Sequence, residues 1–431
     1  MAPAYNHVVA APLAETERAE LLDALRGFAL FGVCLANIFG GFSLWGAPGA
    51  PPAAGLPTAA TDPAAAFLIR ALVEGKFYSL FSLLFGIGFA VQLQRASARG
   101  DAGLHSYRRR LWGLLGIGMV HLLFIWPGDI LAFYALVGLL LLRLRNLSDR
   151  TLLRWAVVLL LLPVPMWAVF WLGGGWTGGG VPLTPAAPFY AVGSALDKPL
   201  GLKSFYEVVA NSDWVLFYKS MRSGFFYRAG DLLFQWRVCK VLAMFLLGLW
   251  VGRHQLFRQP EAHLPLLRRV AGWGLVLGLP ASLLGAYLDL NDAYQQGRAP
   301  GLAHAGLYAL GVAPLAVGYA ALFAQAWARP GGRRVLGQLA PLGRMALTCY
   351  LSQSLIALFL FSGLGLGWVG RLGPTLLWPL ALGIITLQLL GCRWWLRRHQ
   401  LGPAEWLWRS FTYRQWQPSR RLAATFAAGP G

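Results

Sequence analysis

The stretch VHLLFIWPGDILAFYA, residues 120–135, places a histidine and an aspartate inside very apolar sequence. His121 precedes Trp126 by five residues, so it lies roughly 8 Å inside the end of an expected helix. An imidazole titrates near neutrality, which suits it to act as a general base. If chemistry occurs there, the ring should face a hydrated cavity. A neutral histidine can also simply bond a neighbouring helix, and this alternative stays open.

Asp129 has a plainer interpretation. It follows Gly128 and precedes a long apolar segment, which is an N-cap position, although a role in substrate binding is also open. Across a tight turn, His121 and Asp129 would differ in depth by about 6 Å and lie on helices roughly 8–10 Å apart. We therefore expect no direct hydrogen bond between them.

The first apolar segment carries three more candidates. Asp23 and Arg26 in LLDALRGFALFGVCLANI are spaced i, i+3, so they can pair on one helix face. The pair either ends the helix at the membrane boundary or contacts substrate. Asn37 lies about two and a half turns deeper and could join helices or orient a substrate as a catalytic residue.

Three further substrate-binding candidates lie in later segments. Lys76 begins the segment EGKFYSLFSLLFGIGF. The alternative to substrate binding is that it simply anchors this helix at the outer boundary of the membrane. Arg344 stands at an expected helix start in LGRMALTCYLSQSL, and Gln353 lies within that helix. Such polar groups often hold membrane helices together, so the structural interpretation stays open for both. The four cysteines have no CxxC spacing, and no metal site is predicted.

Composition identifies the surroundings of these residues. The chain has 431 residues, of which 57% are hydrophobic and 13% charged, whereas soluble proteins carry roughly 25% charged residues. The mean hydropathy is +0.54. The net charge of +20 is typical of membrane proteins that collect arginine in cytoplasmic loops, and no nucleic-acid motif accompanies it. We therefore expect a lipid bilayer as partner and no nucleic acid.

Apolar runs predict an all-α, polytopic transmembrane bundle of about ten helices. The expected spans are 24–44, 76–94, 110–126, 129–145, 151–172, 234–252, 268–288, 302–327, 342–361 and 374–393. Arginine-rich loops alternate along the chain, which places both termini of this multi-pass protein in the cytoplasm.

The chain divides accordingly into five regions. They are a cytoplasmic tail (1–20), an N-terminal transmembrane bundle (21–172), an extracytoplasmic loop (173–233), a C-terminal transmembrane region (234–416) and a second cytoplasmic tail (417–431). Residues 46–63 are expected to form an irregular outer loop. The 173–233 loop begins GGGWTGGG, a flexible entry, and continues with an aromatic, charged stretch that could lie on the membrane surface.

Five ordered blocks of the chain resemble the YeiB-type bacterial inner-membrane proteins. They are DALRGFALFGVCLANI, KFYSLFSLLFGIGFA, GDILAFYALVGLLLL, GRMALTCYLSQSL and GPAEWLWRSFTY, and they extend from about residue 18 to 415. The second half, from about residue 235, looks like the conserved C-terminal domain of that family.

The first block has a wider likeness. Asp-x-x-Arg-Gly at the start of the first helix is similar to the OafA-type membrane acyltransferases and to heparan-alpha-glucosaminide N-acetyltransferase. Asn37 matches the asparagine of the latter, but no histidine follows shortly after it, where those enzymes carry one. The resemblance implies transfer of an acyl group from cytoplasmic acyl-CoA, as co-substrate, to an acceptor across the membrane.

These observations lead to three functional hypotheses. In an acyltransferase, His121 would be the base, Asn37 would orient the acyl group, and Arg108, Arg109 and Arg110 could meet CoA phosphates, although topology alone explains these arginines. The acceptor would be a small molecule or envelope material, no cofactor would be bound covalently, and homodimerisation stays open. The alternatives are a transporter of a small or amphipathic solute, and a non-catalytic scaffold.

Overall fold

The structure, a computed structural model, describes residues 20–47, 49–97, 101–172, 185–201, 204–290 and 299–420. These residues form helices and no strand, which confirms the all-α prediction. The predicted tails up to residue 19 and beyond residue 420, and the GGGWTGGG entry, lie outside the described residues.

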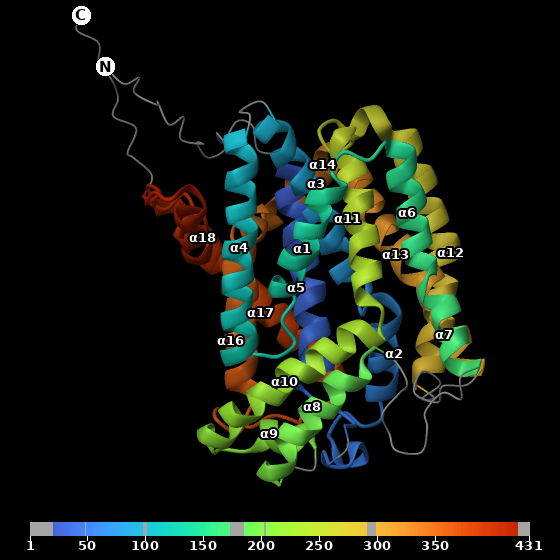
Figure 1. Cartoon of the computed structure of the whole chain (residues 1–431), viewed down its shortest axis with the longest axis vertical. Helices are drawn as coiled ribbons and strands as arrows, with labels where there is room; N and C mark the ends of the chain where they lie inside the picture. Colours follow the sequence, from blue (N-terminus) through green and yellow to red (C-terminus); the bar gives the residue numbers. More distant parts are fainter. Residues whose placement is uncertain are drawn as a thin grey trace, which may run out of the picture.

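Every expected span contains helix (Figure 1). The corresponding helices are α1 (Glu20–Asn37), α3 (Lys76–Ser97), α4 (Asp101–Phe124), α5 (Leu131–Leu144), α6 (Asp149–Leu161), α7 (Pro163–Leu172), α11 (Arg237–Arg253), α12 (Leu264–Leu290), α13 (Ala299–Trp327), α16 (Ala346–Phe361) and α17 (Pro374–Arg398).

Fewer than ten of these helices can cross a membrane by length and composition alone. Within the described ranges six qualify, or eight if each of two bent pairs counts as one span. The difference arises because α5 has only 14 residues and α4 carries the Arg108–Arg110 run.

Helices α3 and α11 pack closely because glycines face each other. A Cβ built on Gly86 would overlap the carbonyl oxygen of Phe245, and one on Gly248 would overlap that of Leu83. Small residues let helix backbones approach in a bilayer, where packing and hydrogen bonds replace the hydrophobic driving force. This contact brings the first turns of α3 and α11 side by side.

The region expected to be an outer loop is largely helical. It contains α8 (Ala187–Asp197), α9 (Phe205–Ala210) and α10 (Trp214–Phe234), which lie together across one end of the bundle (Figure 1). Asp213 caps α10 by accepting hydrogen bonds from the backbone nitrogens of Val215 and Leu216. The chain then bends by 66° into α11, with Trp236 at φ 53°.

The expected irregular loop 46–63 also leads into a helix that was not predicted. α2 (Asp62–Leu72) begins inside the expected irregular loop 46–63. Its Asp62 carboxylate accepts a hydrogen bond from the backbone nitrogen of Thr375, at the start of α17. This long-range contact fixes α2 against the bundle.

Near the C-terminus, α14 (Pro330–Leu336), α15 (Ala340–Arg344) and α18 (Pro403–Tyr413) complete the fold. α15 meets α16 at a bend of 75°. α18 packs on α4, where the indole nitrogen of Trp408 donates to the carbonyl of Arg110.

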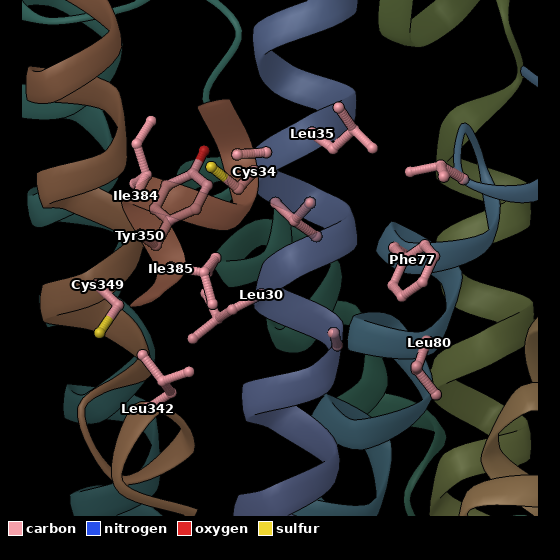
Figure 2. Close-up of a cluster of buried hydrophobic side chains, with 14 of the residues drawn as sticks. Leu30, Cys34, Leu35, Phe77, Leu80, Leu342, Cys349, Tyr350, Ile384 and Ile385 are labelled. Atoms are coloured by element: carbon pink, nitrogen blue, oxygen red, sulfur yellow. The ribbon is translucent and has the colours of Figure 1, made fainter. Parts of the chain in front are cut away.

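The core surrounds α1. Leu30, Cys34 and Leu35 are buried along it, and Figure 2 shows Tyr350 of α16 on the side of α1 that carries Cys34. Phe77 and Leu80 of α3 pack on the other side (Figure 2). The helix is therefore enclosed by apolar side chains from several other helices.

Candidate functional site

His121 and Asp129 are hydrogen-bonded to each other. Nδ1 of His121 lies 2.9 Å from Oδ1 of Asp129, and neither side chain has any exposed surface. The prediction that the two would not bond directly is wrong. The expectation of a hydrated cavity beside the ring is wrong as well, because a ring facing water would retain accessible surface.

A close helix approach explains the contact. A Cβ built on Gly118 of α4 would overlap the backbone nitrogen of Ala132, so α4 and α5 lie nearer than the usual helix spacing. Asp129 precedes α5 and its Oδ2 accepts from the backbone nitrogen of Ala132 at 2.7 Å. The predicted capping role of Asp129 is thus confirmed, and its second oxygen is left for His121.

α10 covers the turn that connects the two residues. The Arg228 guanidinium donates to the carbonyl oxygens of Gly128 and Asp129, at 3.2 and 3.0 Å. Pro127 lies against Gly224 of the same helix. The Arg228 side chain therefore stabilises the turn by binding the backbone of the turn residues.

Two aromatic rings also pack against the imidazole. The Tyr350 ring centroid lies 5.3 Å from that of His121, and Trp126 meets it edge-on at 6.4 Å. Nε2 of His121 is buried and has no hydrogen-bond partner in the described part of the chain. A buried polar atom without a partner is rare and requires an explanation.

The sequence interpretation missed Tyr350 and Arg228. Tyr350 lies in the quoted segment LGRMALTCYLSQSL, three residues from Gln353, and an aromatic hydroxyl in an apolar helix is a weak signal. Arg228 lies in the region expected to be a loop, and only its burial against the turn reveals its role.

Asn37 ends α1, immediately before a π-helical turn at Ile38–Phe42. Phe42 stacks on Trp126 with ring centroids 4.7 Å apart, which links this end of α1 to the turn after His121. Asn37 is partly exposed. No hydrogen bond joins it to His121 among the residues described, so the structure brings their elements together but not their side chains.

The predicted Asp23–Arg26 ion pair is confirmed, with 2.8 Å between Nη1 of Arg26 and Oδ1 of Asp23. The Arg26 side chain keeps 29% of its surface exposed, whereas that of Asp23 keeps 5%.

Gly343 packs against the backbone of Asp23, which brings α15 and its last residue, Arg344, to this end of α1. Arg344 was expected to start a helix, but it ends α15, because the chain bends before α16.

Arg110 and His121 lie on one face of α4. They are eleven residues apart, which is about three helical turns and about 16 Å along the axis. The guanidinium of Arg110 stacks on Trp408 of α18 at 4.0 Å, and Arg26 lies near enough to affect it electrostatically. One side of α4 therefore connects a cationic end to the buried imidazole.

Lys76 and Gln353 lie apart from this pair. Lys76 does begin α3, as predicted, and it is buried with its ammonium donating to the carbonyl of Arg70 at 2.8 Å. Gln353 donates to the side-chain oxygen of Gln388 on α17 at 2.9 Å. Gln353 thus joins two helices, which is the structural alternative for this residue.

Comparison with known proteins identifies the family. Residues 251–415 match a family model described as a protein of unknown function (DUF418). The chain is 31% identical to the uncharacterized protein YxaH of Bacillus subtilis (strain 168), over 94% of this chain and 97% of the relative. It is 30% identical to the uncharacterized protein YeiB of Escherichia coli (strain K12), over 94% of this chain and 98% of the relative.

The search of solved structures found no match. The curated relatives cover almost the whole chain, whereas the family model covers the part from the end of α11 to α18. Multiple apolar helices suit a membrane-embedded protein. On these grounds the chain belongs to the YeiB-type family of helical membrane proteins, with a DUF418 domain in its C-terminal part.

Proposed function

We propose that this protein is a membrane acyltransferase that uses His121 as its general base. The observation that carries the proposal is the state of the imidazole. Asp129 binds Nδ1, which fixes the tautomer and orientation of the ring, and Nε2 is left buried without a partner. An imidazole oriented by a carboxylate with its other nitrogen free is the arrangement that general-base catalysis requires.

The chemistry balances without a resident cofactor. Nε2 of His121 accepts the proton of an acceptor hydroxyl or amine, and the acceptor oxygen or nitrogen attacks the thioester carbonyl of acyl-CoA. The carbon–sulfur bond then breaks, and the leaving thiolate takes up the proton from the imidazolium. Asp129 stabilises the cation formed in between. The products are the acylated acceptor and free CoA.

The cationic end of α4 suits the acyl donor. Arg110 and the partly exposed Arg26 would meet the phosphates of CoA. Because Arg110 lies about three turns from His121 on one helix face, the extended arm of CoA would run along α4 toward the imidazole. Asn37, at the end of α1 that Phe42 links to Trp126, would hydrogen-bond the thioester carbonyl.

The buried ring sets a condition on this mechanism. Nε2 has no solvent access in the structure, so an aromatic side chain must move before substrate reaches it. Tyr350 and Trp126 are the two rings that pack on the imidazole, and one of them would be displaced. While both rings pack on the imidazole, they would also keep water from the thioester when no acceptor is bound.

The test compares two histidine–aspartate pairs. Purified protein in nanodiscs is incubated with radiolabelled acyl-CoA and envelope extract, and label transfer is measured. His121→Ala should lower transfer by at least about a hundredfold. The matched control is His254→Ala, which removes a histidine that also pairs with an aspartate, Asp149, at 2.8 Å, but is 46% exposed. His254→Ala should transfer label at the wild-type rate.

Two results would contradict the proposal. Equal transfer by wild type and a folded His121→Ala variant would remove the base. Absence of transfer, together with solute accumulation in proteoliposomes lacking acyl-CoA, would favour the transporter alternative. The bent pairs α10–α11 and α15–α16 give that alternative some support, because transporters use broken helices. Both bends, however, precede helices of 16 or 17 residues, α16 and α11, rather than interrupt them.

A further inference from the structure

A second group of charged and aromatic residues lies at the first turns of α3 and α11. It contains Tyr78 of α3, Arg237 and Lys240 of α11 and Tyr308 of α13. The two tyrosine hydroxyls are 3.0 Å apart. The guanidinium of Arg237 lies 4.8 Å from the centre of the Tyr78 ring, and the Lys240 ammonium lies 3.8 Å from that of Tyr308.

Three carboxylates lie near this group, and two of them act on Arg237 rather than on Lys240. Asp289 forms an ion pair with Arg70, at 3.3 Å. Glu74 lies near Lys76 and Arg237. Asp231 also lies near Arg237, but it accepts a hydrogen bond from Tyr190.

Lys240 lacks such a partner. Its ammonium makes no hydrogen bond or ion pair with any described residue, and the charged side chain that acts on it most strongly is another cation, Arg237. A cation–π contact compensates only part of the cost of removing an ammonium from water. Within the described ranges, no carboxylate therefore balances the charge of Lys240.

The group is not fully buried. Tyr78, Arg237, Lys240 and Tyr308 each keep part of their surface, and Glu74 beside them is exposed. Both α3 and α11 begin here, so the positive ends of their helix dipoles add to the local potential. The two cations, the helix dipoles and the remaining accessible surface favour an anion.

We propose that the first turns of α3 and α11, together with Tyr308, bind a carboxylate or phosphate group, held by Lys240 and Arg237. Arg237 supplies a planar guanidinium and Lys240 a point charge, a combination suited to either anion. This carboxylate or phosphate belongs to a soluble anion or to the head of an anionic lipid. The site is independent of the proposed acyl transfer, since it shares no residue with the His121–Asp129 pair.

The test uses the full chain in nanodiscs of neutral phosphatidylcholine. Unfolding temperature is followed while phosphate or acetate is added at constant ionic strength, and separately in nanodiscs that contain phosphatidylglycerol. A ligand that binds only the folded state raises this temperature with concentration. Stabilisation by phosphate or acetate identifies a soluble anion, and stabilisation by phosphatidylglycerol alone identifies a lipid head.

Two lysine variants make the result specific. Lys240→Met should weaken the anion affinity by about ten- to a hundredfold, the worth of one charged hydrogen bond. It should also unfold at a higher temperature than wild type when no anion is present, because an unbalanced charge has been removed. Lys219→Met, at an exposed position of α10, should behave as wild type in both respects.

The proposal is overturned if neither soluble anions nor phosphatidylglycerol stabilise the wild-type protein. It is also overturned if Lys240→Met responds to the anion as the wild type does. Absence of stabilisation in the wild-type protein would mean that Lys240 is neutral or that its charge is tolerated without a ligand. Acyl transfer can be measured on the same samples, so failure of this site and failure of the proposed enzyme are distinguishable.

Discussion

Gly118 of α4 lies directly against Ala132 of α5, so closely that a Cβ on the glycine would overlap the alanine backbone nitrogen. That nitrogen is also the one that donates to Oδ2 of Asp129. The close approach of the helices and the placement of the carboxylate beside His121 are therefore parts of one arrangement.

Gly118→Ala should disturb this arrangement. The added methyl forces α4 and α5 apart, at a cost of about 1–3 kcal/mol in the free energy of unfolding. Thermal unfolding in detergent would measure the loss. The matched control is Gly116→Ala on the same helix, where an added Cβ meets nothing within 4 Å. It should be neutral or slightly stabilising because alanine favours helix. Equal stability of the two variants would contradict the packing described.

The same glycine shows where sequence reasoning stopped. Residue types and the turn predicted that Asp129 caps α5, and this holds. The ring of His121, which was expected to face a hydrated cavity, is buried instead. The hydrogen bond between His121 and Asp129 was not predicted, because an average helix spacing of roughly 8–10 Å placed the two side chains too far apart. A single small residue at the contact shortened that spacing, and its facing partner cannot be identified from a linear sequence.

The helices themselves were largely predictable because their apolar runs are long. The exceptions depend on tertiary contacts. α2 has 11 residues and is secured by the bond from Thr375 to Asp62, across most of the chain. α10 has a polar and aromatic mixture without a clear period, and it lies across one end of the bundle (Figure 1). Arg228 became visible as part of the site only once α10 was placed.

Removing the carboxylate of Asp129 should be costly for stability. Asp129→Ala leaves both the Nδ1 hydrogen of His121 and the backbone N–H of Ala132 without their acceptor, in a fully buried place. Each lost partner costs about 1–3 kcal/mol. Asp213→Ala, which removes the exposed cap of α10, should cost about 1 kcal/mol.

A double-mutant cycle isolates the contact with His121. Unfolding free energies are measured for Asp129→Ala, His121→Ala and the double variant. We expect a coupling energy of about 1 kcal/mol or more, since the two groups share one hydrogen bond. Strictly additive effects would mean that the bond contributes nothing to folding.

Glu405 of α18 should make stability depend on pH. It accepts hydrogen bonds from the backbone nitrogens of Leu347 and Thr348 and from the Thr348 hydroxyl. Burial raises the pKa of Glu405 above its ordinary value of 4.5, an effect that outweighs these bonds. The folded state then binds the proton more tightly than the unfolded state.

The folded protein should therefore lose stability as pH rises. As pH rises from the ordinary pKa through the raised pKa of Glu405, the folded state loses stability relative to the unfolded state. Unfolding temperatures of wild type and Glu405→Gln, compared across this range, should show a shallower decline in the variant. Glu261→Gln, at an exposed position, should follow the wild type. A parallel decline in Glu405→Gln would show that another group titrates.

The pairing of α16 with α17 can be tested through two cysteines. Sγ of Cys349 lies 3.4 Å from Sγ of Cys392, and both thiols are free and buried. A membrane-permeable oxidant should link them, because a small movement brings the sulfurs to bonding distance. Mass spectrometry of digested protein would detect the cross-linked peptide. Cys34 is buried in α1 and should remain a thiol, and Cys392→Ser should abolish the link. A disulfide between Cys34 and either partner would show that the helices are arranged differently from Figure 2.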